Sequence, residues 1–288
     1  MTLLTDELAD KIKRIEITAR HLVTDSLAGE YHSVFKGMGM EFDEMRPYSP
    51  GDDVRRIDWN VTARMATPYI RRYQEERELT VFLAVDASGS ADFGTAGQFK
   101  RELAAELAAV LSLAATTNND RVGLLMFTDK PELIVPPKKG RRHVLRMVRD
   151  LLVFTPEGRG TSIESALDTI NRVVKRRSII FLISDFLVEP ESLRRPLAAT
   201  SRRHDVIAVD LNDPMEHQIP DVGLMALEDA ETGDLEWVDT SSKAWRNAFE
   251  ARVVDLEDQK RQLLTSLSID HIQISTDREY IIELNEFF

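Results

Sequence analysis

The sequence lacks cysteine altogether, so disulfides, thiolate metal sites and cysteine nucleophiles are excluded. It also lacks any apolar run near the roughly 18 residues that a membrane-spanning helix needs. Asp6, Glu7 and Asp10 interrupt the first residues, where a secretory signal would need an apolar stretch. We therefore expect a cytoplasmic protein without a membrane span.

Motifs of the common enzyme classes are missing as well. There is no Gly-x-Ser-x-Gly hydrolase turn, no Gly-x-x-x-x-Gly-Lys-[Ser/Thr] phosphate loop and no Gly-x-Gly-x-x-Gly motif. The six histidines stand singly, without the spacing of metal ligands. The net charge of −12 disfavours nucleic-acid binding, which needs a basic surface. These absences favour a binding protein over an enzyme.

Short apolar runs alternate with amphipathic segments in the larger, C-terminal part of the chain. The runs lie at 81–85, 122–127, 179–183, 206–209 and 269–274, and helical patterns cover 98–117, 141–153, 162–175 and 189–201. The first four runs are apolar on both faces, which is typical of parallel strands covered by helices on each side. Residues 79–288 are therefore predicted to form an α/β domain with a doubly wound, mostly parallel sheet.

Two segments break this rhythm. Residues 1–78 are predicted to form an N-terminal helix/β attachment that packs on the core, with a helix at about 6–27 and an edge strand at 69–73. The second segment, about 214–240, contains two short strands around Glu231-Thr-Gly-Asp234, which indicates an inserted β-hairpin. This hairpin carries six acidic residues, so it either contacts a basic partner or is a neutral elaboration.

Small polar side chains follow two of the predicted strands. Asp86-Ala-Ser88-Gly-Ser90 comes directly after the first core strand, and Asp185 follows the strand at 179–183. Thr161 lies in the loop before the helix at 162–175. Ligands of doubly wound sheets bind at the carboxyl ends of the strands, so these five side chains are expected to converge there.

The five side chains offer two carboxylates and three hydroxyls. Oxygen ligands of this kind suit Mg²⁺, Mn²⁺ or Ca²⁺ and not zinc. Mg²⁺ keeps some of its waters, so an acidic residue of another protein could take an open position. The Asp-x-Ser-x-Ser turn alone is also ordinary turn material, and a bare strand-to-helix turn stays the alternative. With Thr161 and Asp185 included, the sequence predicts a site for one divalent cation, Mg²⁺ first.

This pattern resembles the metal-ion-dependent adhesion site of von Willebrand factor A and integrin I domains, where Asp-x-Ser-x-Ser is followed by a Thr and then an Asp. The resemblance implies a von Willebrand factor A-like, Rossmann-type fold. It also implies that Ser88, Ser90 and Thr161 touch the metal directly, and that Asp86 and Asp185 act directly or through water.

Residues 39–76 carry a second resemblance. The segment reads Arg46-Pro47-Tyr48, then Pro50-Gly51-Asp52-Asp53 and Arg55-Arg56-Ile57-Asp58-Trp59. It is similar to the bacterial family known as domain of unknown function 58. Members of that family join such a segment to a von Willebrand A-like domain. The charged residues could form ion pairs that tie the segment to the sheet edge, or they could form a docking surface.

The family resemblance implies a MoxR-type AAA+ ATPase as partner. The expected function is then metal-dependent protein binding by an adaptor or chaperone-like protein, with an unknown client supplying an acidic residue to the metal. Two alternatives stay open. One is a metal-dependent hydrolase or phosphatase, although haloacid-dehalogenase-type phosphatases need an Asp where this chain has Ser88. The other is a structural scaffold with an empty metal site.

Overall fold

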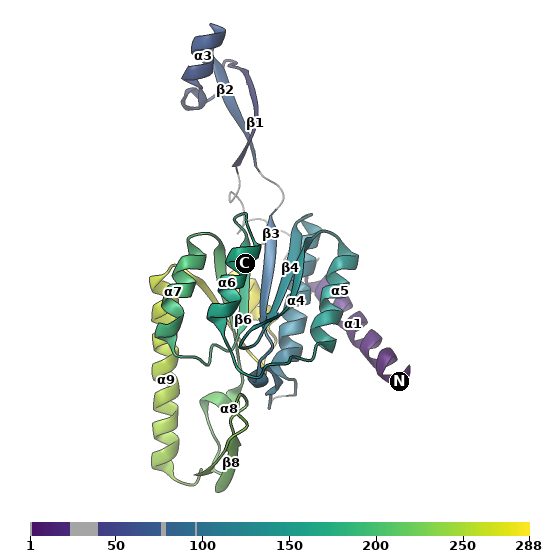
Figure 1. Cartoon of the computed structure of the whole chain (residues 1–288), viewed down its shortest axis with the longest axis vertical. Helices are drawn as coiled ribbons and strands as arrows, with labels where there is room; N and C mark the ends of the chain where they lie inside the picture. Colours follow the sequence, from purple (N-terminus) through teal and green to yellow (C-terminus); the bar gives the residue numbers. More distant parts are fainter. Residues whose placement is uncertain (1, 24–39, 76–78, 96) are drawn as a thin grey trace.

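A six-stranded sheet forms the centre of the computed structural model, which describes residues 2–23, 40–75, 79–95 and 97–288 (Figure 1). Its strand order is β10-β7-β6-β3-β4-β5. The bounds are β3 (Thr80–Asp86), β4 (Arg121–Phe127), β5 (Pro131–Lys138), β6 (Ile179–Ser184), β7 (Asp205–Asn212) and β10 (Asp270–Ser275). All neighbouring pairs are parallel except β4 with β5. The predicted α/β fold class is confirmed.

Helices cover both faces of this sheet. One face packs against α1 (Thr2–Leu22), α4 (Lys100–Thr117), α5 (Arg141–Val153) and α10 (Ile281–Phe287). The other face packs against α6 (Ile163–Val173), α7 (Pro190–Ser201) and α9 (Lys243–Ser266). Among the described residues, no helix combines the length and apolar character needed to cross a membrane.

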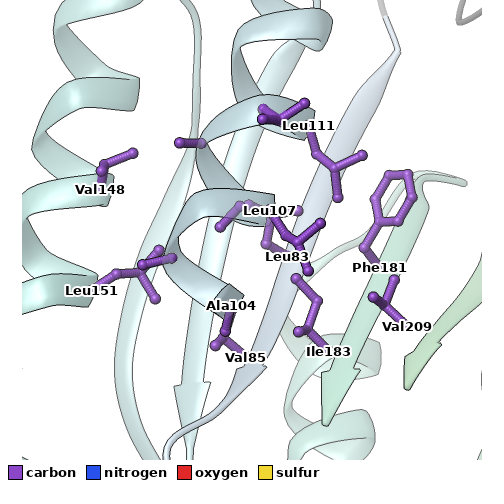
Figure 2. Close-up of a cluster of buried hydrophobic side chains, with 14 of the residues drawn as sticks. Leu83, Val85, Ala104, Leu107, Leu111, Val148, Leu151, Phe181, Ile183 and Val209 are labelled. Atoms are coloured by element: carbon purple, nitrogen blue, oxygen red, sulfur yellow. The ribbon is translucent and has the colours of Figure 1, made fainter. Parts of the chain in front are cut away.

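The alternation of side chains along β3 explains the two layers. Leu83 and Val85 point to one face, where they meet Leu107 and Leu111 of α4 (Figure 2). Phe82 belongs to the core on the other face. Each of these side chains is at most 2% exposed, so both faces are fully covered. A strand with apolar residues on both faces can be stable only in such a sandwich of helices.

Strand β5 was not among the strands expected from the sequence. It contains Pro131, Pro136 and Pro137, which cannot donate to a ladder of hydrogen bonds. The structure tolerates these prolines because β5 lies at the edge of the sheet and pairs only with β4 in the described part of the chain. Its antiparallel direction follows from the short connection after β4.

The described parts of residues 1–78, namely 2–23 and 40–75, lie in different places. Helix α1 packs on the core, where Ile15 and Ala19 are buried with residues of α4. Strands β1 (Met40–Pro47) and β2 (Tyr69–Glu75) form a separate antiparallel pair that projects away from the core together with η2 (Val54–Arg56) and α3 (Trp59–Met65) (Figure 1). The sequence analysis instead placed residues 1–78 as one attachment on the core.

Polar contacts explain how the projecting segment holds its own shape. The Arg46 guanidinium donates to both carboxylate oxygens of Asp52, at 2.9 and 2.7 Å. Asp58 accepts from the backbone N–H groups of Asn60 and Val61 and so caps α3. These bonds join parts of the segment to one another, not to the sheet edge. Trp59, whose side chain is 69% exposed, remains open to solvent.

The predicted hairpin insertion is present. Strands β8 (Leu224–Glu228) and β9 (Leu235–Asp239) pair antiparallel, and the short helix α8 (Pro214–His217) precedes them. Figure 1 shows the hairpin below the carboxyl ends of the core strands, beside the end of α9. The hairpin therefore lies on the same side of the sheet as the predicted metal site.

Candidate metal centre

The Asp86–Ser90 turn and Asp185 lie side by side because β3 and β6 are neighbouring parallel strands. Asp86 is the last residue of β3, and Ser88 precedes the short helix η3 (Gly89–Asp92). Asp185 follows the last residue of β6. Asp86, Ser88 and Asp185 are each at most 7% exposed. The expected convergence at the carboxyl edge therefore holds for these residues.

Hydrogen bonds hold the Asp86 carboxylate from both sides. Its Oδ1 accepts the backbone N–H of Ser88 at 2.9 Å, and its Oδ2 accepts the Ser184 hydroxyl at 2.7 Å. The hydroxyls of Ser88 and Ser90 lie 3.1 Å apart and share a hydrogen bond. Ser184 thus joins the end of β6 to the end of β3 and fixes the orientation of Asp86.

The backbone after Asp185 is strained. Phe186 has a φ of 51°, in the left-handed region that a bulky side chain rarely adopts. Its N–H donates to the Ser184 hydroxyl at 3.1 Å, and the N–H of Leu187 donates to Asp185 Oδ1 at 3.3 Å. Strain of this kind persists only where surrounding contacts hold it, and it is common at functional sites. Here the strained residue directly follows Asp185, whose Oδ1 accepts the N–H of Leu187.

Lys100, at the start of α4, is a part of the site that the sequence analysis did not include. Its ammonium donates to Asp185 Oδ2 at 2.7 Å and to Glu216 Oε1 at 2.5 Å. The Lys100 side chain is 2% exposed, and Glu216 belongs to α8. This buried ammonium between two carboxylates supplies positive charge to Asp185, one of the expected metal ligands.

A small cavity of about 10 Å³ lies among these groups. It is lined by Asp86, Ser90, Lys100, Ser184 and Asp185, with apolar neighbours from two strands, β6 and β7, and two helices, η3 and α4. This volume is about that of one water or one small ion. The oxygen donors fit a hard divalent cation, although one oxygen of Asp185 is already bound by Lys100. In the part of the chain that the structure describes, no three His, Cys, Asp or Glu residues form a metal cluster.

The charges of the site are strongly coupled. Burial, and then the charge on Asp185, raise the pKa of Asp86 to about 7, although the hydrogen bonds from Ser184 and Ser88 act in the opposite direction. Burial lowers the pKa of Lys100, but the two carboxylates outweigh it, so the net pKa lies above its usual value. Burial also raises the pKa of Glu216, partly offset by Lys100. At Asp86, burial and the neighbouring Asp185 charge therefore outweigh the hydrogen bonds that lower its pKa.

Thr161 reaches the neighbourhood of the site through its loop. The backbone N–H of Gly89 donates to the Arg159 carbonyl at 2.8 Å, two residues before Thr161. Thr161 is half-buried, and it is not among the residues that line the small cavity. The structure thus brings the loop of Thr161 to the Asp86 turn.

Gly89 is needed here for a close approach. A Cβ at this position would lie 2.1 Å from the Ala230 carbonyl oxygen, at the tip of the β8–β9 hairpin. The sequence analysis did not connect the hairpin with the metal turn, since about 140 residues separate them in the chain. Only glycine allows the two backbones to come this close.

A larger cleft of about 760 Å³ opens beside the small cavity. One wall is formed by Ser88 and Gly89 of the metal turn, and another by residues 155–159. Residues 225–228 of β8 and Met215 of α8 close the opposite side. A partner bound in this cleft would therefore contact both the metal turn and the hairpin.

This geometry defines the class of protein: an α/β domain with a small oxygen-lined cavity at the carboxyl edge of its sheet. The family described as "Protein of unknown function DUF58" matches residues 44–259, and the chain belongs to this family. An uncharacterized protein of Mycobacterium tuberculosis is 34% identical over 283 residues, which is 98% of this chain and 89% of the relative. The predicted family is thus confirmed.

A solved structure shows the same fold. The conserved hypothetical protein BatB from Bacteroides thetaiotaomicron is 16% identical, with a TM-score of 0.52, over 72% of this chain and 96% of that one. The SpRpn10 VWA domain is also similar, at 11% identity and a TM-score of 0.41, over 73% of this chain and 95% of the domain. At this level of identity, the likeness to BatB establishes the fold alone.

Proposed function

We propose that this protein binds partner proteins at the carboxyl edge of its sheet, and that a divalent cation, Mg²⁺ first, forms part of the binding site. The observation that carries the proposal is the shared cavity of Asp86, Ser90 and Asp185 beside the larger cleft. Two carboxylates with hydroxyl donors suit a hard cation that keeps an open position. An acidic side chain of a partner would complete its coordination.

A binding role is favoured over hydrolysis. The Asp86 carboxylate is buried and receives hydrogen bonds on both oxygens, which disfavours attack on a substrate. Position 88 is a serine, where haloacid-dehalogenase-type phosphatases need a second aspartate. A second candidate function, a scaffold without metal, is supported by Lys100, whose ammonium already offsets the Asp185 charge. Metal titration separates these two candidates.

The first test is calorimetric titration with Mg²⁺. Wild type is expected to bind weakly, because only two carboxylates contribute charge and Lys100 competes for one of them. Asp86→Ala is expected to abolish binding, whereas Asp168→Ala, an exposed aspartate on α6, is expected to leave it unchanged. Equal Mg²⁺ affinity of wild type and Asp86→Ala would remove the metal from the proposal. Absence of binding by wild type would favour the scaffold.

The proposed partner is a MoxR-type AAA+ ATPase, for which the protein acts as an adaptor that presents a client. The support is the family resemblance, together with the lack of a phosphate-binding loop in this chain. An adaptor without a nucleotide site needs an external ATPase to do work on its client. Most of the affinity would come from the surrounding surface, because one coordinated carboxylate rarely makes an interface.

Pull-down of a MoxR-type AAA+ ATPase from the same organism tests this partnership. Capture is expected to fall in EDTA, to return with Mg²⁺ and to weaken in both Asp86→Ala and Thr161→Ala. Asp168→Ala serves as the matched control and should capture as wild type does. Capture that is indifferent to EDTA and to both site variants would place the ATPase contact elsewhere. A lack of capture in every condition would contradict the adaptor proposal.

A further inference from the structure

Strand β8 has a free edge. Two hydrogen bonds of 2.8 Å lie at the two ends of the hairpin ladder. The Asp229 N–H donates to the Asp234 carbonyl, and the Thr240 N–H donates to the Gly223 carbonyl. Hydrogen-bonded pairs alternate in an antiparallel ladder, so the backbone groups of every second residue face away from β9. On β8 these residues are Leu224, Ala226 and Glu228, and all three are exposed. Among the described strands, β8 pairs only with β9.

This free edge faces the large cleft. Four consecutive residues of β8, 225–228, line the cleft, and no residue of β9 does. Consecutive residues of a strand point to opposite faces, so a cleft that touches all four lies along the edge of the strand. The metal turn, with Ser88 and Gly89, lines the same cleft. A chain that pairs with β8 would therefore run past the metal turn.

The other groups in the cleft suit an extended peptide. Met215, Ile219, Met225 and Leu227 form an apolar lining, and methionine side chains adapt readily to different partners. Arg159 is exposed and has no ion pair among the described residues. Of the cleft carboxylates, Asp92 and Glu157 are paired with Arg101 and Lys130, whereas Glu228 has no ion pair among the described residues. Arg159 would therefore attract a carboxylate on the peptide.

We propose that β8 accepts an extended segment of a partner protein as a third strand. Alternate apolar side chains of that segment pack against Met215 and Ile219, and one acidic side chain faces Arg159. Addition of a strand to an exposed edge is a recurring mode of peptide recognition, in which backbone bonds supply affinity and alternate pockets supply specificity. The inference rests on the proposed function, in which partners bind at the carboxyl edge of the sheet. It adds that the partner binds as an extended strand.

The charge of the hairpin disfavours a second copy of this chain as the occupant. Each hairpin carries six acidic residues, namely Glu228, Asp229, Glu231, Asp234, Glu236 and Asp239. Pairing of two β8 edges would bring both sets together, and like charges that face each other across strands are destabilising. A segment of a different protein avoids this repulsion.

The test begins with selection of short random peptides, displayed on phage, against the full chain. The selected peptides are then synthesised, and their binding is measured by fluorescence anisotropy in EDTA and in Mg²⁺. Ala226→Pro removes one outward N–H but no bond to β9, and proline is tolerated at such an edge. Leu235→Pro is the matched control, because its N–H faces away from β8 at the opposite edge of the hairpin.

Ala226→Pro is expected to weaken peptide binding about tenfold or more, since it removes one backbone bond and leaves a peptide carbonyl unpaired. Leu235→Pro is expected to bind as wild type does. N-methylation of alternate peptide nitrogens should cause a similar loss with the unaltered protein, which keeps the test valid if Ala226→Pro does not fold. The selected peptides should show apolar residues at every second position.

Several results would overturn strand addition. They are equal binding to wild type and Ala226→Pro, indifference to N-methylation, and a selection that yields no specific peptide. Sedimentation that shows a wild-type dimer and an Ala226→Pro monomer would make a second copy the occupant. The proposed function is tested independently. If Mg²⁺ does not bind the wild-type protein, the metal site is contradicted, but weaker peptide binding by Ala226→Pro in EDTA would still support strand addition.

Discussion

Replacement of Lys100 with methionine is expected to lower the free energy of unfolding by about 3–5 kcal/mol, because it leaves buried carboxylates without their counter-charge. The ammonium lies 2.7 Å from Asp185 and 2.5 Å from Glu216, and it is 2% exposed. Methionine keeps most of the apolar stem of the side chain, and it removes the ammonium together with its charge and hydrogen bonds. Urea unfolding followed by circular dichroism measures the change.

The matched control for this prediction is Lys175→Met. Lys175 is exposed, and its replacement is expected to change the unfolding free energy by less than about 0.5 kcal/mol. Added Mg²⁺ should recover part of the stability lost in Lys100→Met, because a cation at Asp86 and Asp185 replaces the missing charge. A loss below about 1 kcal/mol in Lys100→Met would contradict the assigned role of the ammonium.

Replacement of Asp86 with asparagine is expected to stabilise the metal-free protein by about 2–4 kcal/mol at about pH 8. The pKa of Asp86 rises from 3.8 to about 7 in the folded protein, chiefly through burial and then through Asp185. The folded state therefore binds the proton more tightly than the unfolded state does. Stability must then fall as the pH rises from about 4 to about 7, since ionisation costs more in the folded protein.

The difference between wild type and Asp86→Asn isolates this effect. It should be small near about pH 3, where Asp86 is largely neutral in both the folded and the unfolded protein, and grow until about pH 8. Unfolding curves in EDTA at several pH values measure it, with Asp168→Asn on the surface of α6 as control. Saturating Mg²⁺ should favour wild type instead. A difference that does not change with pH would show that Asp86 ionises normally.

These two predictions concern the same site, the first its buried cation and the second one of its buried carboxylates. Lys100 compensates Asp185 and Glu216, while Asp86 is buried next to Asp185 without an equally close cation. The metal-free site is thus only partly neutralised. This imbalance is the physical reason to expect that a divalent cation binds here, and that it binds weakly.

Much of the fold could be predicted because its signals are local. Runs of apolar residues at 81–85, 122–127, 179–183 and 206–209 became β3, β4, β6 and β7, since a strand buried on both faces needs apolar side chains throughout. The helix predicted at 141–153 has those bounds in α5. Strand β5 escaped prediction because its prolines are allowed only at a sheet edge, and edge position is not visible locally.

The N-terminal segment shows a second limit. Its tight network of charged residues indicated ion pairs, and Arg46 does pair with Asp52. The sequence did not tell whether such pairs join the segment to the core or to itself. In the structure the Arg46–Asp52 pair lies within the segment, and β1, β2 and α3 project from the domain (Figure 1). The choice depends on three-dimensional neighbours, not on composition.

The sequence by itself determined the place of Asp86, Ser88, Ser90 and Asp185, because residues that follow parallel strands meet at one edge of the sheet. Only the tertiary structure decided which cation stands among them. Lys100 is separated from Asp185 by 85 positions and from Glu216 by 116, and no local pattern connects residues so far apart. The cleft beside β8 likewise exists because the hairpin folds back onto Gly89, a contact that depends on the packing of the whole domain.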